Sequence, residues 1–129
     1  MLQTPRMMLM PNGLMLVVTT SDDRSVLEKI AGRLVELRLA ACCQISSPIT
    51  SVYRWEGRVE QSEEFECRIK TTDAQFDALV KEIESLHNYD VPQIVGVPIE
   101  KCSAAYRAWL LAAVNVCLLY TSPSPRDRG

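Results

Sequence analysis

The chain has 129 residues, of which 47% are hydrophobic, and this suits one domain with a core of its own. Its 14 basic and 16 acidic residues are mixed along the chain and give a net charge of −2, so no strong electrostatic field attracts nucleic acid or anionic lipid. No apolar stretch reaches the roughly 20 residues of a membrane helix, so we expect no nucleic-acid partner and no membrane span.

The first elements predicted are a strand and a helix. Residues 14–20 read LMLVVTT, a continuous apolar and β-branched run that is typical of a strand buried on both faces. Ser21, Asp22 and Asp23 then offer an N-cap and first-turn acids. Because four apolar residues follow at helical spacing, we predict an amphipathic helix over residues 22–38.

A long hairpin is predicted after this helix. Residues 41–55 are extended in character, and Pro48, which cannot donate to a ladder, marks a bend, bulge or edge within them. Glu56-Gly57 is the expected turn, because glycine takes a positive φ at no steric cost. Residues 58–71 contain an alternation of apolar and charged residues, which indicates a strand with one wet face. The apolar side carries Phe65, Cys67 and Ile69, and the wet side carries Glu64, Glu66, Arg68 and Lys70.

A second helix, a short strand and a last helix complete the pattern. Apolar residues at helical spacing predict a helix over residues 73–87, and residues 94–99, IVGVPI, predict a short buried strand. Ser103 can cap the last helix. One side of that helix carries Ala105, Trp109 and Ala112.

The predicted elements follow the order β-α-β-β-α-β plus a helix, which is the ferredoxin-like split βαβ unit of α+β proteins. Right-handed crossovers place both helices on one face of an antiparallel sheet. The strands at 14–20 and 94–99 are apolar on both faces, so the second face needs cover from the final helix or from another subunit. The hairpin strands also look long enough to project and offer edges to neighbours. We therefore predict an oligomer.

Five cysteines bear on the compartment. Their number is odd and no C-x-x-C pair occurs, while the chain is large enough to fold without disulfides. A reduced protein of the cytoplasm is therefore the favoured interpretation. The five are Cys42, Cys43, Cys67, Cys102 and Cys117.

Both ends of the chain fall outside the predicted domain, which we place at residues 14–114. Residues 1–13 are apolar, short and interrupted by two prolines, and are predicted to be a flexible extension rather than a targeting peptide. Residues 115–129 contain the run SPSP, a composition typical of disorder, and are predicted to be a disordered or non-native tail.

Short motifs along this domain carry a resemblance to a known family. They read YRWEGR at 53–58, EQ at 60–61, KTT at 70–72, HNYDVP at 87–92 and YRAW at 106–109, with LAAC at 39–42. In order and spacing they resemble the signature of the CutA family, over about residues 14–113. Each motif alone is weakly specific, but together in register they are a strong signal.

The resemblance implies a trimer of ferredoxin-like subunits, linked to tolerance of copper and other divalent cations, with no established reaction. We therefore expect a non-catalytic homotrimer that binds a metal ion and has no obligatory cofactor. Two positions depart from the family pattern. Asn88 stands where the family usually has proline, and Gln93 stands where it usually has glutamate. The second change removes a carboxylate and weakens any metal site at that point.

The resemblance points to Cys42, Glu64 and His87 as copper ligands. A thiolate, a carboxylate and an imidazole suit copper or zinc. The three lack the sequence spacing typical of metal ligands, so the alternative is that each has a structural role. Cys42 would be a small buried side chain, Glu64 a solvated or interfacial strand residue, and His87 a side chain that interacts with the carbonyl groups at a helix end. Cys42 and His87 as nucleophile and base need contact and an orienting third group, which the sequence does not indicate. We predict no catalytic residue.

Two further sets of residues are candidates for contacts between subunits. The hairpin tip, with Tyr53, Trp55, Glu56 and Gly57, is predicted to form the trimer interface, because exposed aromatic residues beside a turn often mark contact surfaces. Lys70, Tyr89 and Tyr106 are predicted to line a cleft between subunits together with His87. Arg54, Arg58 and Lys70 are the candidates to bind an anion there, and ordinary cross-strand ion pairs of these cations are the alternative. Tyr106 is also expected to anchor the last helix.

The predicted cleft suggests a second hypothesis for function. The PII signalling regulators are trimers of ferredoxin-like subunits that sense small molecules between subunits, and this chain resembles them in predicted architecture. It has only 5 glycines and no loop that would cradle a phosphate, which disfavours a nucleotide. The metal-related homotrimer is therefore the main prediction.

Overall fold

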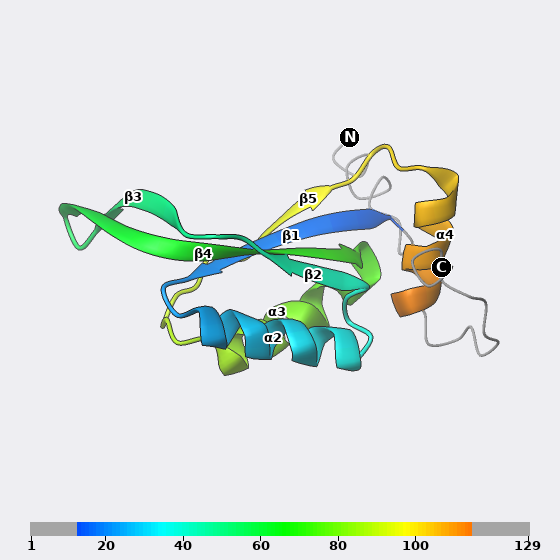
Figure 1. Cartoon of the computed structure of the whole chain (residues 1–129), viewed down its shortest axis with the longest axis horizontal. Coiled ribbons are helices and arrows are strands. Elements are labelled where there is room, and N and C mark those ends of the chain that lie inside the picture. Colours follow the sequence, from blue (N-terminus) through cyan, green and yellow to red (C-terminus); the bar gives the residue numbers. More distant parts are fainter. Residues whose placement is uncertain (1–12, 115–129) are drawn as a thin grey trace, which may run out of the picture.

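The computed structural model describes residues 13–114, and the predictions for residues 1–12 and for the tail at 115–129 lie outside the described residues. The elements follow the predicted order around one five-stranded sheet, which confirms the α+β fold (Figure 1). They are β1 (Leu14–Ser21), α2 (Arg24–Glu36), β2 (Cys42–Ile45), β3 (Ile49–Trp55), β4 (Arg58–Thr72), a 3₁₀ turn (Asp73–Gln75), α3 (Phe76–Leu86), β5 (Val95–Pro98) and α4 (Ala104–Val114). No helix within this described part is long and apolar enough to cross a membrane.

The sheet is built around β4, which pairs with three other strands. β1 runs beside its second half, from the pair Ser21–Phe65 to the pair Leu14–Thr72. β2 pairs with the same half on the other side, and β3 pairs with the first half as a hairpin. β5 lies on the far side of β1, so the order is β2-β4-β1-β5. Every pair is antiparallel, as predicted.

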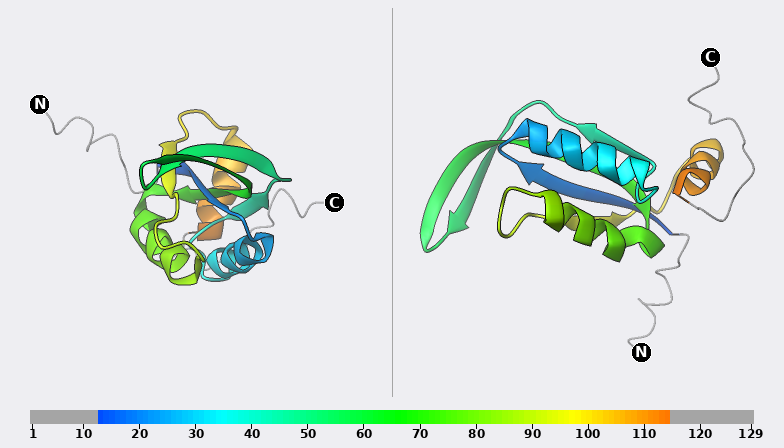
Figure 2. Two further views of the ribbon diagram at one scale, coloured as in Figure 1. Left: turned by 90° about the vertical axis from the view of Figure 1, so that its left-hand side faces the viewer. Right: turned by 90° about the horizontal axis from the view of Figure 1, so that it is seen from below.

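The main core lies between the sheet and two helices. α2 and α3 cover the same face, as the crossover rule predicts (Figure 2). Their apolar stripes meet alternate residues of β1 and β4, since every second residue of a strand points to one face. The buried cluster consists of Val17, Leu27, Ile30, Leu34, Ala40, Cys67, Ile69, Leu79 and Ile83. Each large member stabilises the fold by about 1.5–3 kcal/mol through burial.

The two helices of this layer begin differently. Asp23 is the N-cap of α2, and its carboxylate accepts hydrogen bonds from the Ser25 hydroxyl (2.6 Å) and the Ser25 backbone N–H (2.9 Å). These bonds favour the charged carboxylate and lower the pKa of Asp23. α3 begins at Phe76 rather than at the predicted residue 73, because Thr72 makes no side-chain capping bond and a 3₁₀ turn comes first.

The β3–β4 hairpin turns at the predicted residues. Glu56 and Gly57 both have positive φ, 51° and 79°, which is the pattern of a type I′ turn and matches the twist of the flanking strands. Pro48 lies in the gap between β2 and β3, so the predicted break in the first hairpin strand is confirmed. The hairpin projects well beyond the helical layer (Figure 1, Figure 2).

Two glycines provide a matched test of this turn. Gly57→Ala places a side chain at a φ of +79° and is expected to lower the free energy of unfolding by about 1 kcal/mol. Gly32→Ala lies in α2, where an added Cβ meets nothing within 4 Å, and is expected to raise it by about 0.5–1 kcal/mol. Urea denaturation measures both changes. A Gly57 variant as stable as the parent would contradict the turn geometry.

α4 lies at one end of the sheet, near the start of β1 and the end of β4 (Figure 1). Its buried residues are Leu110 and Val114, which pack with Leu14 and Ala41. The side of this helix that was predicted to carry Ala105, Trp109 and Ala112 is buried only in part, because Ala105 is exposed. The residues packed against this second cluster include Tyr106, four residues before Leu110, so the anchoring role predicted for that tyrosine is confirmed.

β5 is an edge strand that α4 leaves uncovered. Val95 and Val97 are each 48% exposed, so the prediction of a buried strand is wrong for the single chain. Gly96 between them faces the core, where a Cβ would stand 3.0 Å from the Met15 side chain. The apolar pattern correctly predicted a strand in this segment, but a sequence pattern does not show which other elements cover the two faces of that strand. The outer face of β5 is therefore open to solvent in the single chain, which agrees with the sequence-based argument for an oligomer.

Candidate functional site

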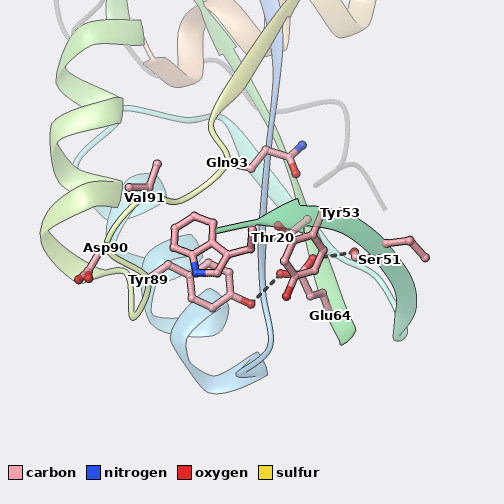
Figure 3. A pocket seen from close by; sticks show the side chains of 10 residues that line it. Thr20, Ser51, Tyr53, Glu64, Tyr89, Asp90, Val91 and Gln93 are labelled. Carbon is pink, nitrogen blue, oxygen red and sulfur yellow. Dashed lines mark hydrogen bonds between the residues drawn. The ribbon is translucent and has the colours of Figure 1, made fainter. Parts of the chain in front are cut away.

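A cavity of about 530 Å³ lies where the base of the hairpin meets the loop that follows α3 (Figure 3). β3 supplies Tyr53 and Trp55, β4 supplies Glu64, and the loop supplies Tyr89 and Gln93. The hairpin brings its residues here because β3 pairs with the first half of β4, beyond the end of β1. A pocket of this size is typical of small-molecule sites.

Glu64 lies buried at this cavity, only 8% exposed. One carboxylate oxygen accepts a hydrogen bond from the Ser51 hydroxyl and the other from the Tyr89 hydroxyl, both at 2.6 Å (Figure 3). The alternation of β4 predicted a solvated position, and that part of the prediction was wrong. The neighbouring strand and the loop after α3 exclude water from it, and two hydroxyl donors satisfy the carboxylate instead.

Tyr89 ties the cavity to the start of α2. Its hydroxyl donates to Glu64 and accepts a hydrogen bond from the Asp22 backbone N–H at 2.8 Å. Burial of the phenol, followed by the bond to Glu64 and the charges of Glu64 and Asp22, raises the pKa of Tyr89. The phenol therefore stays protonated at neutral pH and remains a donor to the carboxylate.

His87 uses both ring nitrogens inside the chain. Nδ1 accepts a hydrogen bond from the Tyr89 backbone N–H at 3.0 Å, so Nε2 carries the proton and donates to the Thr20 carbonyl oxygen at 2.8 Å. The imidazole ring also packs on Tyr89, with ring centroids 4.8 Å apart. His87 can bind a metal only after it gives up one of these hydrogen bonds.

Asn88, which replaces the usual proline of the family pattern, holds the same loop in place. Its carbonyl oxygen accepts from the Ser21 hydroxyl at 2.7 Å, and its amide nitrogen donates to the Asp22 carboxylate at 2.9 Å. No local pattern signalled this contact, because the partners are 67 and 66 residues apart. The loop after α3 is thereby fixed to the junction between β1 and α2.

The remaining predicted site residues lie toward the opposite end of β4. Cys42 pairs with Lys70 across the β2–β4 ladder, and its thiol is 3.4 Å from the Tyr106 hydroxyl. Lys70 donates to the Gln44 side chain at 2.8 Å, a neutral partner in place of the cross-strand ion pair that was the alternative. The predicted cleft residues therefore divide, with Lys70 and Tyr106 at one end and Tyr89 at the other.

The proposed copper ligands do not meet within one chain. Glu64 lies six positions before the partner of Cys42 in β4, which places them about 20 Å apart along the strand. In residues 13–114, no group of three or more His, Cys, Asp or Glu side chains is arranged to hold a metal ion. A site that uses Cys42, Glu64 and His87 together would require ligands from more than one subunit.

Comparison with known proteins assigns the family. Residues 15–113 match the family model described as CutA1 divalent ion tolerance protein. The chain belongs to the CutA1 family. The divalent-cation tolerance protein CutA of Thermus thermophilus is 42% identical over 94 residues, which cover 73% of this chain and 91% of the relative. Protein CutA of Mus musculus is 33% identical over 100 residues, 78% of this chain, and the chain spans just over half (56%) of that relative.

Solved structures of CutA1 proteins share the fold. The structure of the divalent cation tolerance protein from Thermus thermophilus superposes with a TM-score of 0.74 at 40% identity, over 75% of this chain and 94% of that one. The family and the ferredoxin-like fold expected from the sequence motifs are therefore confirmed. The PII-like alternative gains no support from these matches.

The hairpin residues predicted for the interface of this CutA1 chain are open to solvent. Tyr53 is 42% exposed and Trp55 is 51% exposed, and Val52 and Val59 beside them are exposed by 64% and 67%. Cys42 and His87, weighed as nucleophile and base, each contact other partners and lie at opposite ends of the sheet. The geometry of these two residues therefore does not make them a catalytic pair.

Tyr89→Phe tests the hydrogen bond that satisfies the buried carboxylate. The variant keeps the ring but leaves one Glu64 oxygen and the Asp22 N–H without their partner, so we expect a loss of about 1–3 kcal/mol in the free energy of unfolding. Tyr53→Phe is the control, because its hydroxyl makes only an exposed contact of 3.4 Å to Ser62. Urea denaturation compares the two, and equal stability would remove the structural role of Tyr89.

Proposed function

We propose that this CutA1-family chain acts in divalent-cation tolerance as a homotrimer that binds metal and catalyses no reaction. Its family supports the cation-related role. The observation that carries the assembly is the apolar surface that a single chain leaves open on the hairpin and on β5. Exposed large apolar side chains on both elements, such as Trp55 and Val97, often mark an interaction surface in a soluble protein. Three copies, rather than two, are what the family resemblance implies.

Copper or another divalent cation is the proposed ligand. Cys42, Glu64 and His87 offer soft, hard and borderline donor atoms, and they lie at two ends of one sheet. A head-to-tail arrangement of subunits would bring the Cys42 end of one copy toward the Glu64 end of the next. His87 would exchange its bond to Thr20 for the metal. The free Cys42, Cys43, Cys67 and Cys102 support a cytoplasmic, reducing location.

Light scattering and calorimetry test this proposal on the full chain. We expect a scattering mass of three chains at micromolar concentration, and heat on titration of the reduced protein with Cu(II) or Zn(II). A mass of one chain would overturn the assembly. Absence of heat with both metals would overturn the metal-binding role while leaving the assembly standing.

Single substitutions identify the ligands in the same calorimeter. Cys42→Ser and His87→Ala should each weaken copper binding by about ten- to a hundredfold if these side chains hold the ion. Cys102→Ser is the matched control, since this thiol is also partly exposed and reduced but is not a proposed ligand. Unchanged affinity in either test variant would remove that residue from the site.

A further inference from the structure

The cavity at the base of the hairpin combines aromatic rings with one buried acid. Tyr53, Trp55 and Tyr89 line it, together with Glu64. None of the lining residues within 13–114 is a lysine or an arginine. Aromatic faces carry negative electrostatic potential, and so does a carboxylate, so the wall favours positive charge.

The charge of Glu64 is not neutralised by its neighbours. Its hydrogen-bond donors, Ser51 and Tyr89, are neutral hydroxyls. The four salt bridges found among residues 13–114 all involve other glutamates. A buried carboxylate attracts a cation more strongly than one in water, because the local dielectric constant is lower.

A divalent metal ion fits this cavity poorly. Among the described residues, Asp90 is the only other acid that lines it, and its side chain points away from Glu64 (Figure 3). One carboxylate that already accepts two short hydrogen bonds cannot supply the several oxygen ligands that a hard cation needs. A cation that binds through aromatic contact and long-range attraction needs no such set.

We propose that this cavity binds a small organic ammonium ion. The alkyl groups contact Tyr53 and Trp55, and the charged nitrogen lies within electrostatic reach of Glu64. The volume of about 530 Å³ holds a ligand of several heavy atoms. Because Tyr53 and Trp55 are half exposed, a neighbouring subunit on the hairpin would close the outer wall. Of the three proposed metal ligands, only Glu64 lines this cavity. Cys42 and His87 are not among its lining residues.

Nuclear magnetic resonance titration of the full chain tests this site. The probe is tetramethylammonium, and the reference is tert-butanol, a neutral molecule of similar shape. We expect tetramethylammonium to bind at least about tenfold more tightly than tert-butanol. The indole N–H signal of Trp55 should move during the titration, while that of Trp109 in α4 should not. Equal affinity for the two molecules, or no movement at Trp55, would overturn the proposal.

Glu64→Gln keeps the shape and one of the two acceptor oxygens, replaces the other oxygen by an amide NH2 that can donate to the Ser51 hydroxyl, and removes the charge. It should weaken tetramethylammonium binding by about tenfold and leave tert-butanol binding unchanged. Glu63→Gln is the matched control, because this exposed neighbour on β4 carries the same charge outside the cavity. An equal loss of tetramethylammonium affinity in both variants would mean that only the net charge of the protein matters, and would overturn the site. Copper calorimetry is read separately, so a chain that binds copper but not the ammonium ion overturns only this inference.

Discussion

Replacement of Tyr53 and Trp55 by serine is expected to convert the assembly into single chains. These two aromatic side chains are about half exposed on a hairpin that stands clear of the domain. Burial of an aromatic side chain at an interface contributes about 2–3 kcal/mol, and every copy in a ring loses two of them. Light scattering should show the mass falling from three chains to one, with circular dichroism showing a folded subunit.

The control for this variant removes apolar surface elsewhere. Val35 and Leu37 are exposed by 42% and 39% near the end of α2, outside the predicted interface. Their double replacement by serine should leave the mass at three chains. If the hairpin variant keeps the mass of the parent, or if both double variants dissociate alike, the hairpin is not the interface.

Leu34→Ala is expected to produce the largest loss of stability among single substitutions discussed for this chain. Leu34 is fully buried between α2 and the sheet, and its backbone carbonyl also receives the N–H groups of Leu39 and Ala40 at the end of the helix. Truncation of a buried leucine removes the burial energy and leaves a cavity, which together cost about 2–5 kcal/mol. The measurement is urea unfolding at a fixed chain concentration, because association raises apparent stability.

Val35→Ala gives the comparison that isolates burial. This residue is next in sequence on the same helix, but it is 42% exposed. Its replacement should change the free energy of unfolding by no more than about 0.5 kcal/mol. A similar loss of unfolding free energy in both variants would contradict this prediction, because the effect would then not depend on the burial of the replaced side chain.

The parts of the fold that the sequence predicted are those with a clear period. β1 and the second half of β4 carry alternating or continuous apolar residues, and α2 repeats them at helical spacing, so element type and inward face follow directly. Pro48 and Gly57 allowed correct predictions from backbone chemistry alone. Proline has no backbone N–H to donate to a neighbouring strand, and glycine accepts a positive φ. Local rules of this kind need no knowledge of distant segments.

The features that were missed depend on distant segments. The exposure of β5 follows from the short reach of α4, which covers Leu14 but not Val95 or Val97. Glu64 looks like a solvated residue in an alternating strand until the loop with Tyr89 folds over it. Pattern analysis gives the face on which a side chain lies, and tertiary contacts decide whether water reaches that face.

The sequence named some of the residues that the structure brings together at the candidate site, but not their arrangement. The family resemblance pointed to Glu64, His87 and Tyr89, and the structure places all three around the loop after α3. The bond of His87 to Thr20 and that of Asn88 to Ser21 were not predicted, because contacts across 67 positions leave no local signal. Cys42 was grouped with them although the register of β2 puts it at the other end of the sheet.

β4 runs along the subunit from the hairpin turn toward the end of the sheet near α4 (Figure 1). Its 15 residues extend about 50 Å, from the turn at Gly57 to the pair Thr72–Leu14. Leu14 at that far terminus supports the closing helix through Leu110 and Val114. One continuous strand therefore joins the hairpin that lines the cavity to the end of the sheet on which α4 packs.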